Sequence, residues 1–371
     1  MRVLDLTDSR IDFPLSGGKD SRLLLGLLIA AGYRDRVSGT YTNGPEFSPE
    51  VVSAKAVAEH FRLPHRNIWN GTPTRQNLPN LREKLLAHLH LTEGEMSPID
   101  LTTGTLIRNR FTLTGQEAGL RNIAGKRDVS TRALLQQWMF VHFGKADFCG
   151  VYTDAAAEKG RQELIDYIDQ CERDGTPHEQ IPSRHRVEFR GSRWVSRVWG
   201  IMNATEFAPQ IFRSEIITKA TYNSGARSRQ LEEFHFQMLH RIDRKLVEIP
   251  FSGQIWDPEL ESITSTHVPQ LTPIRWPEGF TVFSQRGMFG IMQDHFDDIK
   301  SFIIENIGSM DDFIDVDKLA NRDAASIQTG HVAPMWQLFQ CALFNAINDF
   351  GDLLSTNADA MGMPKFQSEQ D

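Results

Sequence analysis

The sequence predicts an α/β protein in which a parallel, doubly wound sheet is followed by a mostly helical region. Between residues 10 and 70, apolar runs of strand length alternate with runs of helical period, which is typical of strands joined by helices. From about residue 130 onward, helical periods dominate. We therefore expect an α/β domain over residues 1–130, a helical region over 131–354 and a mobile tail over 355–371, which has no apolar period.

The first predicted elements surround a glycine-rich turn. Apolar runs at 3–6 and 11–15 predict two strands, and the second leads into the turn. The next helix is expected over 22–31 and ends at Gly32, a residue that commonly terminates helices. The other elements of the α/β domain are expected as strands at 37–42, 65–69 and 110–114 and helices at 49–61 and 81–91. Later helices are expected over 131–143, 154–171, 186–199, 228–247, 288–307 and 333–350.

Composition excludes several classes of protein. The chain has 371 residues, of which 40% are hydrophobic and 24% charged, as in globular proteins. Its longest apolar run, Leu23–Ala31, is far shorter than the roughly 20 residues of a membrane span. The acidic and basic residues at the N-terminus do not suit a secretory signal, so a cytosolic location is expected. Three scattered cysteines support neither a disulfide framework nor a zinc site.

The turn Ser16-Gly17-Gly18-Lys19-Asp20-Ser21 is the strongest functional signal in the sequence. Its glycines let backbone N–H groups face one concavity at the positive end of a helix, where anions bind. The two serines add hydroxyl donors, and Lys19 can neutralise a phosphate. Asp20 can hold a Mg²⁺ that bridges phosphate oxygens. The spacing matches neither the P-loop of kinases nor the dinucleotide fingerprint, which disfavours both classes.

With the preceding Leu15, this turn resembles the pyrophosphate-binding loop of the PP-loop ATP pyrophosphatase superfamily. The resemblance implies an adenine nucleotide alpha hydrolase-like sheet and an enzyme that splits ATP between its α- and β-phosphates. It implies that residues 16–21 bind the β- and γ-phosphates, with Lys19 catalytic and Asp20 on Mg²⁺. The adenine is expected against the strand at 37–42, where Thr42 contacts the nucleotide.

Two further stretches resemble the synthetase domain of asparagine synthetases. The first comprises Tyr41–Gly44, Pro49–Phe61 and His65, and the second is the turn Leu113–Gly119. This resemblance implies adenylation of a substrate carboxylate, followed by amide formation with an amine or ammonia. At the second turn, Gly115 is expected to contact the nucleotide.

Two residues near the second turn have open roles. Glu117 is expected on the metal, with a solvated loop carboxylate as the alternative, because the acidic pair usual in the family is replaced here by Gly119 and Leu120. Arg121 is expected to reach a phosphate or a substrate carboxylate, with a plain surface arginine as the alternative.

The later part of the chain carries a weaker resemblance. Arg227, Glu232 and His235 look like the C-terminal helical region of stand-alone asparagine-synthase-like proteins, so the helical region is expected to complete the synthetase-like domain. Glutamine-dependent members carry a glutaminase with Cys after the initiator Met, whereas this sequence has Arg2. A separate ammonia donor or a partner glutaminase is therefore expected.

Two alternatives to an amide ligase stay open. One is a PP-loop enzyme that activates a nucleobase in RNA or DNA, which the basic helix face of Arg186, Arg190, Arg193 and Arg197 would suit. The formal charge of −8 opposes nucleic acid, and the same face suits salt bridges on a helix surface. The other is a nucleotide-binding protein without catalysis.

One acidic stretch is also ambiguous. Its residues suit a Mg²⁺ or substrate-amine site, or simply an exposed loop; they are Glu93, Glu95 and Asp100.

Overall fold

The computed structural model describes residues 10–69, 110–111, 113, 115, 120–121, 123–143, 150–189, 206–207, 211–278, 286–327 and 332–346. It confirms an α/β protein with a small parallel sheet and many helices. Within these ranges, none of the helices combines the length and the apolar character that crossing a bilayer requires.

The sheet is parallel throughout, and the first strand lies at its centre. The strand order is β3-β2-β1-β4-β5. The strands are β1 (Ile11–Pro14), β2 (Val37–Thr42), β3 (His65–Asn67), β4 (Arg110–Phe111) and β5 (Glu206–Phe207). The predicted strand at 37–42 is confirmed with the same bounds, and those at 11–15 and 65–69 are confirmed over shorter ranges. The predicted strand at 3–6 and helix at 81–91 lie outside the described residues.

Two helices connect the first three strands. They are α2 (Lys19–Ala30) and α3 (Pro49–His60). The side chain of Ser48 accepts a hydrogen bond from the backbone N–H of Val51, which caps α3, and proline at the first helical position suits the start of a helix. Because β1, β2 and β3 follow one another in one direction across the sheet, right-handed connections place both helices on the same face.

The other regular elements of the described chain are helices. Its α-helices are α5 (Arg132–His142), α6 (Asp154–Arg173), α7 (Ile181–His185), α9 (Glu215–Asn223), α10 (Gly225–Gln230), α11 (Glu233–Ile242), α12 (Lys245–Glu248), α13 (Leu260–Thr264), α14 (Arg286–Asp294), α15 (Phe296–Glu305), α16 (Val316–Ala320) and α17 (Val332–Ala346). Its 3-10 helices are η1 (Arg34–Arg36), η4 (His178–Gln180), η6 (Ile211–Arg213), η7 (Gly308–Met310) and η8 (Ala324–Ser326).

Two predicted helices are interrupted, so the expectation of single helices over 228–247 and 288–307 was wrong. The first divides into α10, α11 and α12 because Glu232 has a left-handed backbone (φ 57°) and Asp243 an extended one (φ −164°). The second divides at His295, whose φ of −113° separates α14 from α15. In both cases the apolar period continues across the break, so periodicity by itself does not reveal it.

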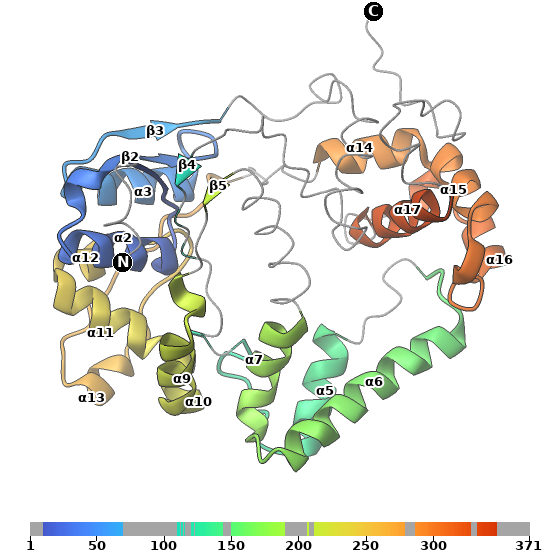
Figure 1. The fold of residues 1–371 in the computed structure, drawn as a ribbon, viewed down its shortest axis with the longest axis horizontal. Coiled ribbons are helices and arrows are strands. Elements are labelled where there is room, and N and C mark those ends of the chain that lie inside the picture. The colour runs from blue at the N-terminus through green and yellow to red at the C-terminus, as the bar shows by residue number, and fades with distance from the viewer. Residues whose placement is uncertain are drawn as a thin grey trace, which may run out of the picture.

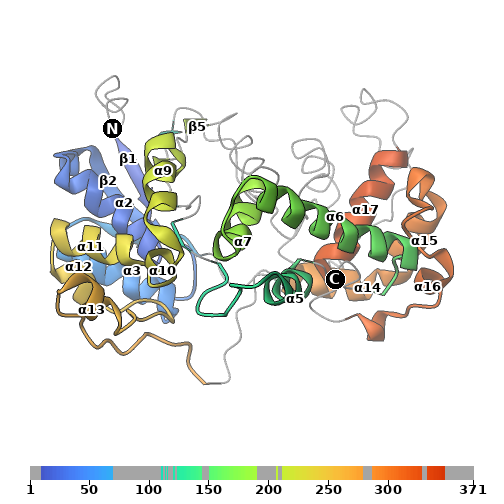
Figure 2. The same cartoon turned by 90° about the horizontal axis from the view of Figure 1, so that it is seen from below.

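Buried apolar residues form three separate clusters. The sheet cluster joins β1, β2, α2 and α3 to residues between 212 and 268, so the core of the sheet continues well past residue 130. The connecting cluster lies between α5, α6 and α7. The C-terminal cluster joins α14–α17. Figures 1 and 2 show the sheet at one side of the molecule, α14–α17 at the opposite side, and α5–α7 between them.

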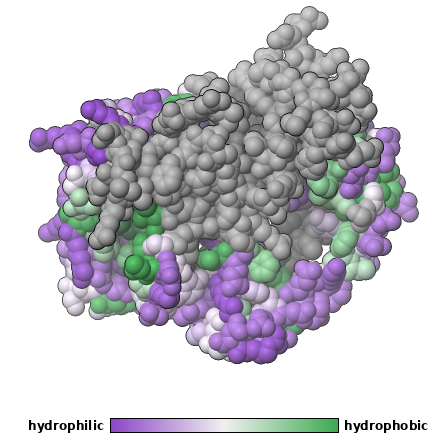
Figure 3. All heavy atoms as spheres, viewed as in Figure 1, coloured by the Kyte–Doolittle hydropathy of each residue, from purple (hydrophilic) through white to green (hydrophobic). Residues whose placement is uncertain are grey.

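The surface follows from the helix patterns. Helix α6 has 20 residues, of which only Leu164, Ile168 and Cys171 are buried. These three are spaced three to four residues apart and therefore lie on one side of the helix. Mainly hydrophilic residues therefore cover the lower part of the molecule in Figure 3, where α5 and α6 lie. Helix α6 therefore packs against the rest of the protein through this narrow apolar stripe.

Candidate active site at the carboxyl edge of the sheet

The loop at residues 16–21 lies where the direction of the chain across the sheet reverses. It follows β1, whose neighbours are β2 on one side and β4 on the other. The chain passes first to β2 and β3 and then crosses back to β4, so β1 and β4 flank the switch point of the sheet. Open α/β sheets bind ligands outside the carboxyl ends of their strands at such a point. The loop is therefore placed where a ligand is expected.

Serine hydroxyl groups close the loop on itself. The Ser21 Oγ accepts the Ser16 backbone N–H at 3.1 Å, and the two hydroxyl oxygens lie 2.9 Å apart. The Ser16 Oγ accepts the Gly18 N–H at 3.3 Å. Gly18 is the N-cap of α2 and offers no side-chain cap, so the first-turn amides of this 12-residue helix lack one. The predicted strand, glycine turn and helix are present, although α2 begins at Lys19 instead of Arg22.

Gly17 is enclosed by two other segments of the chain. A Cβ built on Gly17 would lie 2.7 Å from the Ser252 Cβ and 3.0 Å from the Glu50 Cα, so no larger residue fits here. Its backbone N–H donates to the Glu50 Oε2 at 2.6 Å. A carboxylate from the first turn of α3 thus already lies on one loop amide, as a phosphate oxygen would.

The predicted nucleotide residues Thr42 and Gly115 both adjoin the loop. The buried Thr42 hydroxyl donates to the Leu15 carbonyl oxygen at 2.5 Å, linking β2 to the last residue before the loop. A Cβ on Gly115 would lie 2.5 Å from the backbone of both Asp20 and Ser21. Only glycine lets the segment after β4 approach the first turn of α2 this closely. The structure therefore brings both predicted turns together.

Lys19 points into the protein. It is 1% exposed, forms an ion pair with Glu232, and donates to the Ile255 carbonyl oxygen at 3.1 Å. Its ammonium also lies 4.4 Å from the ring centre of Trp256, a cation–π distance. Burial lowers the pKa of Lys19, and the neighbouring charge of Arg121 acts in the same direction, while the bond to Glu232 opposes both. The structure brings Lys19 to a carboxylate at the start of α11.

Arg121 bridges two carboxylates. Its Nε lies 2.7 Å from the Glu232 Oε1, and its Nη2 lies 3.2 Å from the Asp20 Oδ2. The Arg121 side chain is 24% exposed, against 2% for that of Lys19, so Arg121 is the more accessible cation. Both predicted catalytic residues thus share the Glu232 carboxylate as a partner.

Both oxygens of the Asp20 carboxylate have cationic or imidazole partners. Oδ1 lies 2.6 Å from Nε2 of the fully buried His235, and Oδ2 faces Arg121. Burial raises the pKa of Asp20, but the His235 hydrogen bond and the charges of His235, Arg121 and Lys19 outweigh it, so the pKa lies below its ordinary value. Burial likewise raises the pKa of Glu232, and Lys19 and Arg121 bring it below its ordinary value. Both carboxylates are therefore held ionised.

The site does not fit Mg²⁺ at Asp20 as the side chains stand. A metal ligand needs a carboxylate oxygen open toward the metal, whereas both oxygens of Asp20 face His235 and Arg121. Within the described residues, no three histidine, cysteine, aspartate or glutamate side chains come close enough to hold a metal ion. Glu117, the second predicted ligand, lies outside those residues.

The other candidate clusters fall largely outside the described residues. The acidic stretch with Glu93, Glu95 and Asp100 lies outside them, as do Arg190, Arg193 and Arg197 of the basic face. Arg184, which precedes that face, forms ion pairs with Asp174 and Glu188.

Sequence reasoning missed the partners of the loop. The resemblances included Glu232, His235 and Glu50 without giving any of them a role. Their contacts cross 213, 215 and 33 residues of chain, respectively. The one local signal is the spacing of Glu232 and His235, three apart at the start of a helix, which directs both side chains to one side.

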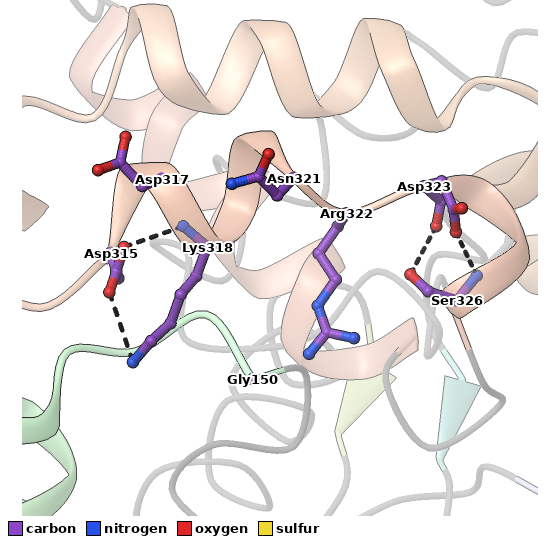
Figure 4. Close-up of a pocket in the computed structure, with 8 residues that line it drawn as sticks. All are labelled: Gly150, Asp315, Asp317, Lys318, Asn321, Arg322, Asp323 and Ser326. Atoms are coloured by element: carbon purple, nitrogen blue, oxygen red, sulfur yellow. Dashed lines mark hydrogen bonds and ion pairs between the residues drawn. The ribbon is translucent and has the colours of Figure 1, made fainter.

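An open pocket of about 570 Å³ lies beside α16, far from the sheet. Figure 4 shows that the Asp315 carboxylate faces Lys318, that the Asp323 carboxylate faces Ser326, and that the Arg322 guanidinium extends toward Gly150. Lys318 pairs with Asp315, and the Asp323 carboxylate accepts a hydrogen bond from the Ser326 backbone N–H. We assign this pocket no function.

Comparisons with known proteins give no family. No family model matches the chain, and no curated protein matches it significantly.

Proposed function

We propose that this chain binds ATP at the loop of residues 16–21 and transfers AMP to a substrate carboxylate, and that an amine or ammonia then attacks the acyl group to form an amide. One observation carries the proposal. The glycine loop after β1 meets Gly115 and Arg121, which follow β4 in the chain, at the switch point of a parallel sheet. The family resemblance of the loop implies this class of reaction, and it also implies an adenine nucleotide alpha hydrolase-like fold.

The proposed chemistry has two balanced steps. A carboxylate oxygen attacks the α-phosphorus of ATP, and the bond from that phosphorus to the bridging oxygen breaks, so pyrophosphate leaves with its electron pair. The amine nitrogen then attacks the acyl carbon, AMP leaves, and the nitrogen loses a proton. Alignment and neutralisation of the charge developing on the phosphates supply most of such catalysis.

The residues of this chain would contribute at stated atoms. The first-turn amides of α2 and the Ser16 and Ser21 hydroxyls would bind the departing pyrophosphate. The Arg121 guanidinium, whose side chain is 24% exposed, would neutralise part of the negative charge of the pyrophosphate. Lys19 holds Glu232, which in turn holds Arg121, so we assign Lys19 to positioning as long as its ammonium stays on Glu232. The adenine is proposed against β2.

A screen for pyrophosphate release tests this function. The full chain is incubated with ATP, pooled carboxylates and pooled amines, and products are identified by mass spectrometry. We expect substrate-dependent release that falls at least 100-fold in Ser16→Ala, because the variant lacks a loop hydroxyl. Ser130→Ala, at an exposed position before α5, is the matched control and should retain activity. Equal turnover in Ser16→Ala and the wild type would reject the site.

A nucleotide-binding protein without catalysis is the second candidate. The burial of Lys19 and its ion pair with Glu232 favour it, because the loop cation then faces away from a bound phosphate. ATP binding by calorimetry, together with no release across the whole screen, would favour this candidate.

A further inference from the structure

We propose that Phe47 and Trp276 form a stacking surface for the adenine base of ATP, beside the carboxyl end of β2. This rests on the proposed function, because it concerns the nucleotide whose phosphates the loop of residues 16–21 would bind. It goes beyond that function by naming the two side chains that would hold the base.

The two rings form an edge-to-face pair. Their centres lie 6.4 Å apart, and their planes are inclined by 83°. Aromatic pairs of this geometry are favourable beyond the area that they bury, so each ring helps to orient the other. Whatever else its ring contacts, Phe47 is 49% exposed, whereas Trp276 is partly buried. The pair therefore offers aromatic surface to a flat ligand.

The turn that carries Phe47 is held in place by hydrogen bonds. Asn67, the last residue of β3, donates from its Nδ2 to the Gly44 carbonyl oxygen at 2.7 Å. The Ser48 backbone N–H donates to the Pro45 carbonyl oxygen at 2.8 Å, and the Ser48 hydroxyl caps α3. The backbone on both sides of the ring is thus fixed before a ligand arrives, which reduces the entropy lost on binding.

Each ring belongs to a segment that contacts Gly17. On one side, the Glu50 carboxylate accepts the Gly17 N–H at 2.6 Å, and Phe47 lies three residues before Glu50. On the other side, the Ser252 N–H donates to the Gly17 carbonyl oxygen at 3.1 Å. Ser252 also forms a parallel bridge with Ile274, which precedes the tryptophan of the pair by two residues. Because three residues of chain span at most about 11 Å, the pair lies close to the loop.

The order of these features along the sheet matches the order of the parts of ATP. The loop after β1 presents backbone amides and serine hydroxyls, which suit phosphates. The turn after the neighbouring strand β2 carries Phe47, and the Thr42 hydroxyl holds the end of β2 to Leu15, the residue before the loop. Nucleobases stack on aromatic rings because every base has a π face. A nucleotide with its phosphates on the loop can therefore extend its base toward the pair.

The test compares ATP with inorganic triphosphate, which lacks a base, in calorimetric titrations of the full chain with Mg²⁺. We expect Phe47→Ala to weaken ATP binding about 10-fold and to leave triphosphate affinity within about 2-fold of the wild type. Phe47→Trp keeps an aromatic ring and should bind ATP within about 3-fold of the wild type. Phe313→Ala is the matched control, because Phe313 is 41% exposed just before α16, and it should bind both ligands as the wild type does.

Two results would overturn the proposal. One is unchanged ATP affinity in Phe47→Ala, and the other is an equal loss for ATP and triphosphate, which would show that the ring only supports the loop. Failure of the wild type to bind either ligand would instead refute the proposed function. Should Phe47→Ala fail to fold, judged by its thermal melt, Trp276→Ala decides in its place. For that variant we expect a loss of about 3-fold for ATP and none for triphosphate.

Discussion

The sheet region and the C-terminal helices have opposite interiors. Around the loop, five charged or titratable side chains are wholly or largely buried, and they are Lys19, Asp20, Arg22, Glu232 and His235. In α14–α17, the only buried polar side chain within the described residues is Gln340, amid apolar residues. Burying a charge costs free energy that an apolar core avoids, and the cost is tolerated where each charge has a partner.

This difference makes the sheet region the candidate for function. Perturbed, mutually paired groups at the carboxyl edge of a sheet are candidates for function, whereas an apolar helix cluster is explained by packing. Two findings would contradict this contrast. One is that the buried charges of the sheet region affect only stability, and the other is that changes in the helical core alter anion binding at the loop.

The largest effect is expected from Arg22→Met. The fully buried Arg22 guanidinium donates to the carbonyl oxygens of Leu246 and Ile249 at 2.9 Å and 2.7 Å, and to the Ser53 hydroxyl at 2.9 Å. Methionine would leave these acceptors buried without a donor, so we expect a loss of about 3–5 kcal/mol in the free energy of unfolding. Chemical denaturation measures it.

Arg34→Met is the matched control for that variant, because Arg34 also donates to backbone carbonyls but lies at an exposed position. Its loss should stay within about 0.5 kcal/mol. A loss in Arg22→Met as small as this would show that the buried guanidinium does not hold α2 to α12.

The next effect concerns pH and the connecting cluster. His185 is buried between the rings of Phe143, Tyr167 and Phe189, and burial lowers its pKa to about 4. In the unfolded chain a histidine protonates below about pH 6.5. The folded state binds this proton only near pH 4, so its free energy of unfolding falls as pH drops from 6.5 to 4, by about 3 kcal/mol.

A variant isolates this contribution. The free energy of unfolding should fall by about 2–3 kcal/mol less in His185→Leu than in the wild type between pH 7 and pH 4.5. His267→Leu, at an exposed position, should show no such gain. Parallel pH dependence of His185→Leu and the wild type would contradict the assignment.

A smaller effect, of opposite sign, is expected in the C-terminal helices. Within the described chain, neither side-chain amide atom of the fully buried Gln340 has a hydrogen-bond partner. Gln340→Met keeps the length of the side chain and removes two unsatisfied polar groups, so we expect about 1–2 kcal/mol of stabilisation. Thermal melting checks this, and pyrophosphate affinity should not change. A destabilised variant would indicate that the amide has a partner.

The smallest effect is expected at the loop itself. The Glu50 carboxylate occupies the Gly17 N–H that a phosphate oxygen would use. Glu50→Gln removes a negative charge beside the anion site, so pyrophosphate should bind about 3- to 10-fold more tightly in calorimetry. Glu59→Gln, near the other end of α3, is the control. Weaker binding in Glu50→Gln would show that the carboxylate maintains the loop.

The sequence by itself predicted the local architecture of the site. The strand at 11–15, the glycine turn and the strand at 37–42 follow from apolar runs bounded by turn residues, because strand and turn propensities act over a few residues. The resemblance of the second turn to asparagine synthetases pointed to Gly115 and Arg121, and the structure brings both to the loop.

Only the tertiary structure decided what the charged side chains do. Lys19 meets Glu232 and Asp20 meets His235 across more than 200 residues, because α11 packs against α2. No periodic pattern reports such a contact, and neither does it report the left-handed break at Glu232 that begins α11. Which cation is buried and which is more exposed depends on these long-range contacts, since burial and pairing are properties of the folded chain and not of any local stretch.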